Sequence, residues 1–331
     1  MRYPVDPHFP VRDEDAPLKA DLAEKKVKPI FIMGLHRSGT TFLYDSVARA
    51  FPLAQLTLYD FFYYDRLLRN HQQGGAKQDA QRLNACFAAL GIKDRNIDSV
   101  PVSAEEVEEY GYLLRRRFGS FKLNEHSAAF FEEMCRKLLT VHAGSEAVLL
   151  KNPWDTGNAR WMAERFPEAR FIYISREPIA VLNSMLNALL SYLEGPQHYL
   201  EMLLDRGDGR RSYRAGYIVW LGLRGLRKLI GRRAIARLAR PLLARTVAKQ
   251  VAAYRRELAA MPSDQTVEVD YSALRESPDA VMASLAPLLA VSRSASAESM
   301  RAVTAGRPVN PVLRDYAEHL DRLVERELGA A

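Results

Sequence analysis

The stretch of sequence that decides the fold is Pro29-Ile30-Phe31-Ile32-Met33-Gly34-Leu35-His36-Arg37-Ser38-Gly39-Thr40-Thr41-Phe42-Leu43. Its first residues are apolar and rich in β-formers, and the run is bounded by Pro and Gly, which predicts a buried strand over 29–34. A helix is predicted from about Gly39 to Ala50, because Pro52 follows and stops it. Between them, Gly34 to Thr41 keeps the Gly-x-x-x-x-Gly-x-Ser/Thr frame of a phosphate-binding loop (P-loop). Backbone N–H groups at the start of such a helix surround an anion.

The loop argues against a nucleoside triphosphate as its ligand. Nucleoside triphosphatases carry a loop Lys that clamps the β- and γ-phosphates, and this chain has Thr40 at that position. The basic residue inside the loop is Arg37, whose planar guanidinium suits a two-point contact with phosphate or sulfate oxygens. A P-loop kinase acting on a small molecule is therefore the alternative enzyme class, and it would need Mg²⁺ and the missing Lys.

The order of elements along the chain predicts an α/β fold with a parallel sheet. Further strands are predicted at 147–151, 170–175 and 265–270, and helices that end near 166 and 193 alternate with them. Additional helices are predicted at 79–90, 103–116 and 127–142. We expect one domain over 1–331, with 1–28 as an N-terminal extension and 195–260 as a basic helical insertion.

The stretch from Phe31 to Leu43 resembles the 5′-phosphosulfate motif of the sulfotransferases that use 3′-phosphoadenosine-5′-phosphosulfate (PAPS). That family carries a second motif, a strand that ends in Arg and a helix with Ser eight residues on, and 171–184 is similar to it through Arg176 and Ser184. Segments 149–171 and 267–278 extend the resemblance over most of 28–290, with features of bacterial and tyrosylprotein sulfotransferases. It implies a nucleotide-kinase-like three-layer fold, with a central parallel sheet and a large helical elaboration.

The resemblance also implies how PAPS is held. The 3′-phosphate falls to Arg176, which leaves the sheet at its carboxyl edge, and to Ser184, about two turns into the next helix. Phe42 matches a position where cytosolic relatives carry an adenine-stacking Trp. The product would be adenosine 3′,5′-bisphosphate, and no metal is implied. The residues assigned to the donor at the loop are Gly34, His36, Arg37, Ser38, Gly39, Thr40, Thr41 and Phe42.

Sulfuryl transfer is an in-line displacement in which negative charge develops on the leaving phosphate, so positioning and electrostatic stabilisation dominate. Arg37 is the first candidate for that stabilisation. Lys151 matches a Lys that the family places near the bridging oxygen. The predicted reaction is therefore transfer of a sulfuryl group from PAPS to a hydroxyl or amine acceptor.

The sequence leaves the general base open. Cytosolic sulfotransferases carry a His two residues after the Lys, where this chain has Pro153. Asp60 falls near a catalytic Glu of the tyrosylprotein sulfotransferases, Asp155 falls where related bacterial sequences show His, and His36 is a third candidate. A binding module that keeps the nucleotide site and lacks a base is a further alternative. A run of acids in the predicted helix 103–116 reads as a solvated face: Glu105, Glu106, Glu108 and Glu109.

Positive charge is concentrated in one segment. Residues 210–256 hold fourteen Lys or Arg and no Asp or Glu, whereas the whole chain carries a formal net charge of +7 and the remainder therefore −7. Leu and Ile interleave with these residues, which predicts either an amphipathic helical hairpin on an anionic membrane or a helical subdomain packed on the core. We expect a lipid-like or otherwise amphipathic acceptor, with an aromatic run lining its pocket: Tyr59, Phe61, Phe62, Tyr63 and Tyr64.

Other partners and locations are disfavoured. No nucleic-acid recognition motif accompanies the charge. Met1 to Lys28 lacks the apolar core of a signal peptide, and no apolar run reaches the length of a membrane span, so we expect a cytoplasmic protein, either free or peripheral at the inner face of the membrane. Cys86 and Cys135 show no metal-ligand spacing and are predicted to be buried thiols.

Overall fold

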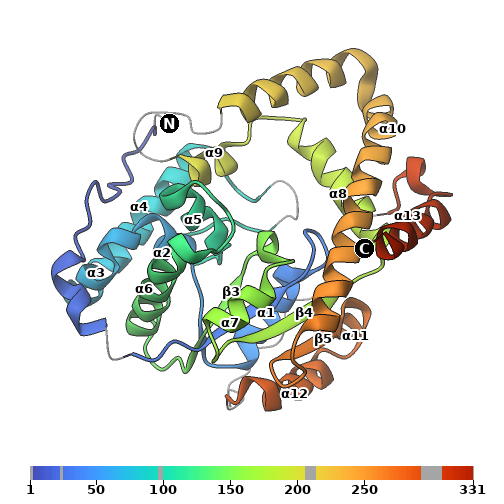
Figure 1. The fold of residues 1–331 in the computed structure, drawn as a ribbon. Helices are drawn as coiled ribbons and strands as arrows, with labels where there is room; N and C mark the ends of the chain where they lie inside the picture. Colours follow the sequence, from blue (N-terminus) through green and yellow to red (C-terminus); the bar gives the residue numbers. More distant parts are fainter. Residues whose placement is uncertain (1–2, 23–24, 96–99, 206–213, 292–307, 331) are drawn as a thin grey trace.

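The computed structural model describes residues 3–22, 25–95, 100–205, 214–291 and 308–330. Its centre is a sheet of five parallel strands in the order β2-β3-β1-β4-β5 (Figure 1). The predicted α/β class with a central parallel sheet is confirmed, and so are the strands expected from the sequence. The strands are β1 (Pro29–Met33), β2 (Leu53–Ala54), β3 (Ala147–Lys151), β4 (Arg170–Ser175) and β5 (Thr266–Asp270).

Helices cover both faces of the sheet, because alternate residues of each strand point to opposite sides. Ile30 and Ile32 of β1 join a core under one set of helices, and Phe31 and Met33 join a core under the other. This arrangement is the expected three-layer architecture. On the first face lie α1 (Thr40–Ala50), α11 (Tyr271–Glu276) and α12 (Pro278–Leu289), and on the second lie α6 (Glu125–Val141), α7 (Ala159–Arg165) and α8 (Pro178–Tyr192).

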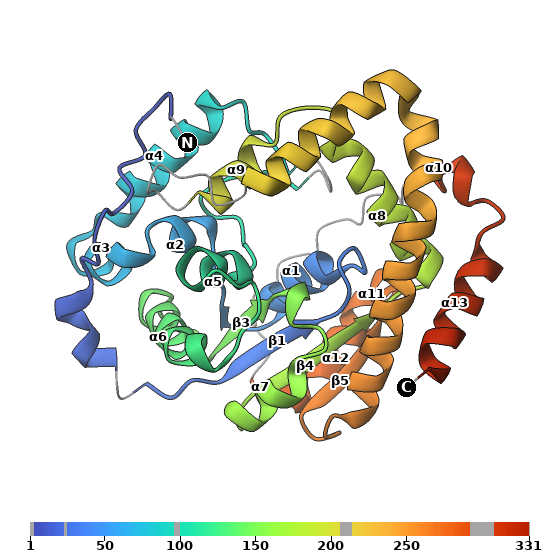
Figure 2. The ribbon, with the colours of Figure 1, turned by 45° about the horizontal axis from the view of Figure 1, so that its top comes forward.

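A group of short helices closes one end of the second face (Figure 2). The N-terminal extension packs against this group, where the ring of Phe9 stacks on Phe62 at 4.9 Å, and against α6, whose buried Lys137 ammonium lies 2.7 Å from Asp15. Cys86 and Cys135 are buried free thiols, as predicted. The group consists of α2 (Leu58–Phe62), η2 (Tyr64–Arg66), α3 (Leu67–Gln73), α4 (Ala76–Ala89) and α5 (Tyr110–Phe118), with η1 (Ala16–Leu22) beside it.

Two predictions about this region are wrong. The helix expected over 103–116 begins only at Tyr110, because the preceding residues form a ladder with the start of α2: Leu58 donates to the Glu106 carbonyl at 2.8 Å and Glu108 to the Leu56 carbonyl at 2.9 Å. Four of the five aromatic residues expected to line an acceptor pocket are instead buried, whereas the fifth, Tyr59, is half-buried and borders a recess with Asp60 and His142. Phe61, Phe62, Tyr63 and Tyr64 are buried in the core, where Tyr63 donates to the Pro7 carbonyl.

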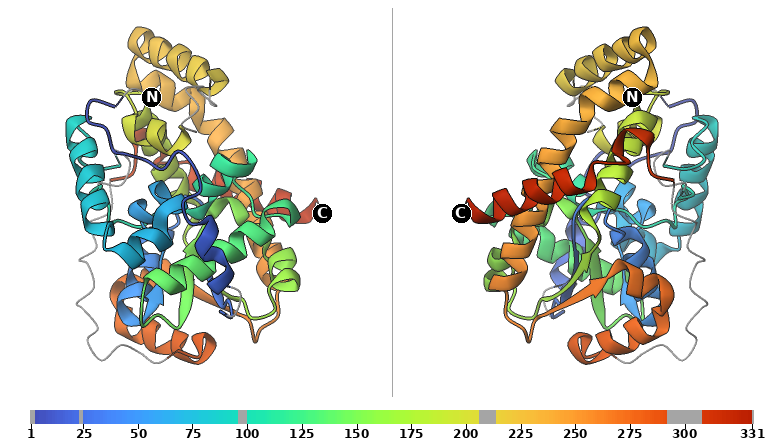
Figure 3. Two further views of the ribbon diagram at one scale, coloured as in Figure 1. Left: turned by 90° about the vertical axis from the view of Figure 1, so that its left-hand side faces the viewer. Right: turned by 90° about the vertical axis from the view of Figure 1, so that its right-hand side faces the viewer.

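The basic segment forms α10 (Arg214–Ala260), a long helix that breaks at Gly231, where φ is 82° and ψ is 167°. The break divides the helix into a first half that projects from the body and a second half that packs against α8 and α13 (Figure 3). The segment is thus one kinked helix and not a hairpin, and its second half shows the packing on the core that was the other expected arrangement. Residues 210–213 of the segment lie outside the described residues. The remaining elements are η3 (Pro153–Asp155), α9 (His198–Leu204), η4 (Pro311–Leu313) and α13 (Ala317–Gly329). In the part of the chain that the structure describes, no helix is long and apolar enough to cross a membrane.

Candidate active site

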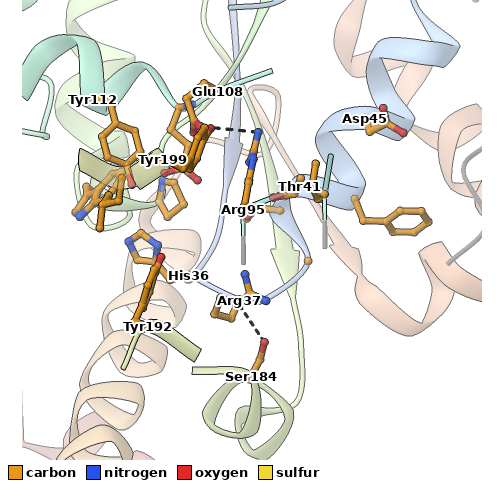
Figure 4. Close-up of a pocket in the computed structure, with 18 of the residues that line it drawn as sticks. His36, Arg37, Thr41, Asp45, Arg95, Glu108, Tyr112, Ser184, Tyr192 and Tyr199 are labelled. Carbon is orange, nitrogen blue, oxygen red and sulfur yellow. Dashed lines mark hydrogen bonds and ion pairs between the residues drawn. The ribbon is translucent and has the colours of Figure 1, made fainter. Parts of the chain in front are cut away.

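A cavity of about 400 Å³ opens where β1, β3 and β4 end, which is the edge at which open parallel sheets bind ligands (Figure 4). The loop after β1 forms its floor, and α5, α8 and α9 form its walls. The residues from the loop and α1 are His36, Arg37, Gly39, Thr40, Thr41, Phe42 and Asp45. The other walls include Arg95, Glu108, Glu109, Tyr112, Trp154, Arg176, Ser184, Tyr192, Gln197, Tyr199 and Tyr271.

The loop has a backbone that few sequences tolerate. Gly39 has a φ of 106°, and a Cβ atom there would lie 2.4 Å from the ring of Tyr271. Arg37 adopts a φ of 72°, an uncommon conformation for a residue with a side chain, which the surrounding structure must hold. The Ser38 hydroxyl donates back to the Leu35 carbonyl at 2.8 Å and so closes the turn. The loop is therefore held in a shape that turns Arg37 into the cavity and leaves the start of α1 open to it.

The two motifs predicted to bind the two ends of PAPS lie in direct contact. Nε of Arg37 donates to the Ser184 hydroxyl at 3.0 Å, and the Arg176 guanidinium donates to the Arg37 carbonyl at 3.0 Å. Arg176 also lies 4.3 Å from the centre of the Tyr271 ring. Burial lowers the pKa of Arg176, but an Arg side chain stays charged in proteins. Two guanidinium groups and a hydroxyl thus meet at one end of the cavity, with the Tyr271 ring beside them.

Phe42 lies at the same end. Its ring stands edge-on to that of Tyr271, with the centroids 6.5 Å apart, and both rings line the cavity. Two aromatic side chains beside the cationic groups suit a ligand that combines anionic groups with a flat base.

Lys151 lies behind the cavity wall and is only 2% exposed. Its ammonium donates to the Thr41 hydroxyl at 3.0 Å and forms an ion pair with Glu109 at 3.0 Å, and both of these residues line the cavity. Burial would raise the pKa of the Glu109 carboxyl, but the Lys151 charge outweighs it, so that pKa lies below its usual value. Glu109 is therefore a carboxylate at neutral pH.

His36 faces the same part of the cavity and stands edge-on to Trp154, with ring centroids 4.8 Å apart. Burial lowers the pKa of the imidazole, and Lys151 and Arg37 add to that effect against the opposing charge of Glu109. His36 is therefore neutral at pH 7 and able to accept a proton or a hydrogen bond.

The end of the cavity away from Arg176 is largely aromatic. The rings of Tyr112 and Trp154 meet edge-on at 5.2 Å, and Tyr192 and Tyr199 come from the end of α8 and from α9. The Tyr199 hydroxyl donates to the buried Glu108 carboxylate, which in turn lies 3.8 Å from Arg95. This end can therefore hold an apolar or ring-bearing molecule against fixed polar groups.

The structure places both aspartates predicted as general base away from the cavity. Asp60 caps α2, because its carboxylate accepts from the Thr57 backbone N–H at 2.9 Å, and it also lies 3.0 Å from Nε2 of His142. Asp155 is fully buried and accepts from the Tyr110 hydroxyl at 2.6 Å and the Leu123 N–H at 3.0 Å. Burial raises the pKa of Asp155, against the lowering effect of these bonds. Both carboxylates hold neighbouring segments together.

The expectation of a solvated acidic face is wrong for two of its four residues. Glu108 is 3% exposed and the Glu109 side chain 14%, and both line the cavity. Gly111, two residues after Glu109, is the residue in the sequence that signals this arrangement. A Cβ atom there would lie 2.4 Å from Oδ1 of Asn152, so Gly111 allows the start of α5 to approach the end of β3.

Fold and cavity together define the class: an α/β protein of the P-loop type, whose loop and neighbouring strand end direct cationic and hydroxyl side chains into one pocket. A family model described as "Sulfotransferase family" matches residues 29–213, more than half of the chain, and the chain belongs to this family. The prediction of a sulfotransferase is confirmed at that level.

Solved structures show the same fold. A sulfotransferase of Mycobacterium tuberculosis superposes with a TM-score of 0.55 at 18% identity, over 96% of this chain and 80% of that one. A sulfotransferase of Mycobacterium avium gives a TM-score of 0.54 at 16% identity, over 93% and 79%. No curated protein matches the sequence significantly.

Proposed function

We propose that this protein transfers a sulfuryl group from PAPS to a hydroxyl-bearing acceptor. The observation that carries the proposal is the contact between the two anion-binding motifs: Arg37 of the loop bonds to Ser184, and Arg176 bonds to the loop backbone. A ligand that satisfies both motifs has two anionic groups, and the phosphosulfate and 3′-phosphate of PAPS supply them.

The residues fit the donor in a defined order. The N–H groups at the start of α1, with the Thr40 and Thr41 hydroxyls, would hold the 5′-phosphosulfate, because anions bind at the positive end of a helix. Arg176 and Ser184 would hold the 3′-phosphate, and the rings of Phe42 and Tyr271 would flank the adenine. The narrow approach at Gly39 fits this assignment, since a side chain there would occupy the space of Tyr271.

Transfer requires an acceptor oxygen to attack sulfur while the bond from sulfur to the bridging phosphate oxygen breaks. The acceptor proton passes to a base, and the chain stabilises the charge that develops on the leaving phosphate. Arg37 would face that charge from within the cavity. Lys151 lies behind the cavity wall, where its ammonium bonds to Thr41, and would add positive charge from there. Adenosine 3′,5′-bisphosphate would then leave as the second product.

We propose Glu109 as the base, in place of Asp60 and Asp155. It lines the cavity, its lowered pKa keeps it ionised, and Lys151, 3.0 Å away, lies between it and Thr41 of the loop. His36 is the second candidate, because it is neutral at pH 7 and lines the same wall. The aromatic end formed by Tyr112 and Trp154 supports an acceptor with an apolar or ring-bearing portion next to its hydroxyl.

The donor assignment is tested by binding, without Mg²⁺, of adenosine 3′,5′-bisphosphate and of adenosine 5′-phosphosulfate, which lacks the 3′-phosphate. Arg176→Gln should weaken the first ligand about 10- to 100-fold, the effect of losing a charge-assisted bond, and leave the second within a few-fold. Arg160→Gln, on an exposed arginine of α7, is the matched control and should change neither affinity.

Equal weakening of both ligands would mean that Arg176 only supports the loop and would remove the 3′-phosphate assignment. Binding of ATP that requires Mg²⁺ and exceeds that of the bisphosphate would favour the kinase alternative. A protein that binds the bisphosphate but moves no label from radiolabelled PAPS to any lipid, carbohydrate, protein or small-molecule fraction of a lysate would be the binding module instead.

A further inference from the structure

The first half of α10 presents its apolar side chains to solvent and not to the body. The half-buried side chains of this half lie three or four residues apart, at Tyr217, Trp220, Arg224 and Arg227. Trp220 donates to the Tyr192 carbonyl at 2.7 Å, and Arg227 donates to the Leu193 carbonyl at 3.4 Å. The exposed large apolar residues of this half are Ile218, Val219, Leu221, Leu223, Leu226, Leu229 and Ile230, and one exposed charged residue, Lys228, lies among them. Three of them are mostly exposed, Ile218 by 67%, Val219 by 61% and Leu229 by 84%.

This orientation is the reverse of an ordinary surface helix, which turns its apolar stripe inward and its charges outward. Seven large apolar side chains on one arc of a projecting helix form a contiguous exposed patch. Patches of this kind mark surfaces that another body covers.

Positive charge lies at the C-terminal end of the patch, where Arg232 also pairs with Glu194. Lys228, Arg232, Arg233 and Arg237 are exposed and lie beside it or just beyond the break at Gly231. The second half of α10 also lines a recess of about 450 Å³ with η4. The recess is formed by Arg233, Arg237, Arg240, Arg314 and Asp315, with Asn310, Pro311 and Val312.

We propose that the outward face of α10, from Ile218 to Ile230, docks on an anionic lipid bilayer, with the adjacent arginines at the level of the lipid phosphates. Charge decides the occupant. A second copy joined through the same face would bring two strongly basic segments together, which is unfavourable, whereas an anionic bilayer supplies the opposite charge and an apolar layer beneath it. The proposal does not depend on the reaction that the cavity catalyses.

The test is co-sedimentation of the full chain with vesicles of phosphatidylcholine alone or mixed with phosphatidylglycerol. The full chain should pellet with the mixed vesicles and far less with phosphatidylcholine alone. The variant Ile218→Ser, Leu226→Ser, Leu229→Ser should weaken binding by at least about 100-fold, and Arg233→Gln with Arg237→Gln by about 25-fold. Val5→Ser with Val11→Ser removes exposed apolar side chains elsewhere and should leave binding unchanged, as should Arg160→Gln.

Thermal unfolding is the control for folding, and each variant should unfold as the unchanged chain does, because the changed side chains point to solvent. The proposal fails if the full chain stays in the supernatant with anionic vesicles at low salt, or if the triple serine variant binds like the unchanged chain. It also fails if light scattering finds a dimer that the triple variant dissociates, because the face would then serve a second copy.

Discussion

Replacement of Glu109 by Gln tests the chemistry of the cavity, because it exchanges one carboxylate oxygen for an NH2 group. The side chain keeps its size but loses its charge, so the proposed role as general base and the ion pair with Lys151 are removed together. Removing a general base costs about 10²- to 10⁴-fold in kcat. Leaving a buried ammonium without its carboxylate costs about 3 kcal/mol of folding free energy, since Lys151 is 2% exposed and its bond to Thr41 does not neutralise its charge.

The pH dependence follows from the direction of the pKa shift. The pKa of Glu109 is lowered in the folded protein, so the ion pair contributes its full stability above the ordinary value of 4.5 and loses it as the pH falls through the folded-state value. A rate that depends on this carboxylate should therefore stay level as the pH falls from about 7 to about 5. Stability and kcat of the variant should be compared near pH 7, where the pair is fully ionised.

The assay is sulfuryl transfer from radiolabelled PAPS, with the affinity for adenosine 3′,5′-bisphosphate measured in parallel. Glu109→Gln should lose kcat and keep that affinity within a few-fold. Glu105→Gln, four residues earlier and exposed, is the matched control and should change neither kcat nor that affinity. A variant with kcat within threefold of the unchanged chain would refute the role of Glu109. An acid limb below the ordinary histidine value of 6.5 that disappears in His36→Asn would assign the base to His36.

Two further predictions concern the loop and a buried ion pair. Gly39→Ala should weaken adenosine 3′,5′-bisphosphate at least about 10-fold and destabilise the fold by about 1–3 kcal/mol, because its Cβ would meet the Tyr271 ring; Gly144→Ala, with a φ of 87° and open space around it, should cost stability alone, and equal binding by both variants would contradict the account. Burial alone would lower the pKa of His142, but its 3.0 Å contact with Asp60 outweighs burial and raises that pKa. The pair therefore stabilises the fold fully below the ordinary value of 6.5 and less as the pH rises through the folded-state value, so His142→Asn should flatten the fall in unfolding free energy as the pH rises above 6.5. An unchanged slope in urea titrations would show that His142 is not the titrating group.

Local patterns made half of this site predictable. The strand, loop and helix around Gly34 to Ala50 are specified by residues close in sequence, and so are the strand end at Arg176 and the helix that carries Ser184. Asp60 shows the limit of such reasoning. Its resemblance to a catalytic Glu suggested chemistry, yet Thr57 three residues earlier places it in the spacing of a helix cap, and the structure shows that cap.

The aromatic end of the cavity could not be predicted from the sequence, because its position depends on pairing between distant segments. The segment that ends at Glu108 pairs with residues 56–58 and does not form the predicted helix. Glu108 and Glu109 therefore line the cavity, although the sequence predicted that they face solvent. Tyr199 reaches the same wall from α9, more than ninety residues on. No local periodicity encodes contacts of this kind, since they are set by which segments the sheet and α5 bring together.

The sequence of the basic segment predicted its residue types and helical spacing, but not which face of the helix turns toward the body. Leu, Ile and Arg at helical spacing fit a core-packed helix and a membrane-facing helix equally well. What separates the two is the anchor: Trp220 turns inward and bonds to the carbonyl of Tyr192, which leaves the apolar arc outside. Tyr192 itself lines the cavity at its aromatic end. The projecting helix is thus fixed to the wall where an acceptor would bind, so docking of α10 on a bilayer would bring that wall toward the lipid surface and favour acceptors that are themselves amphipathic.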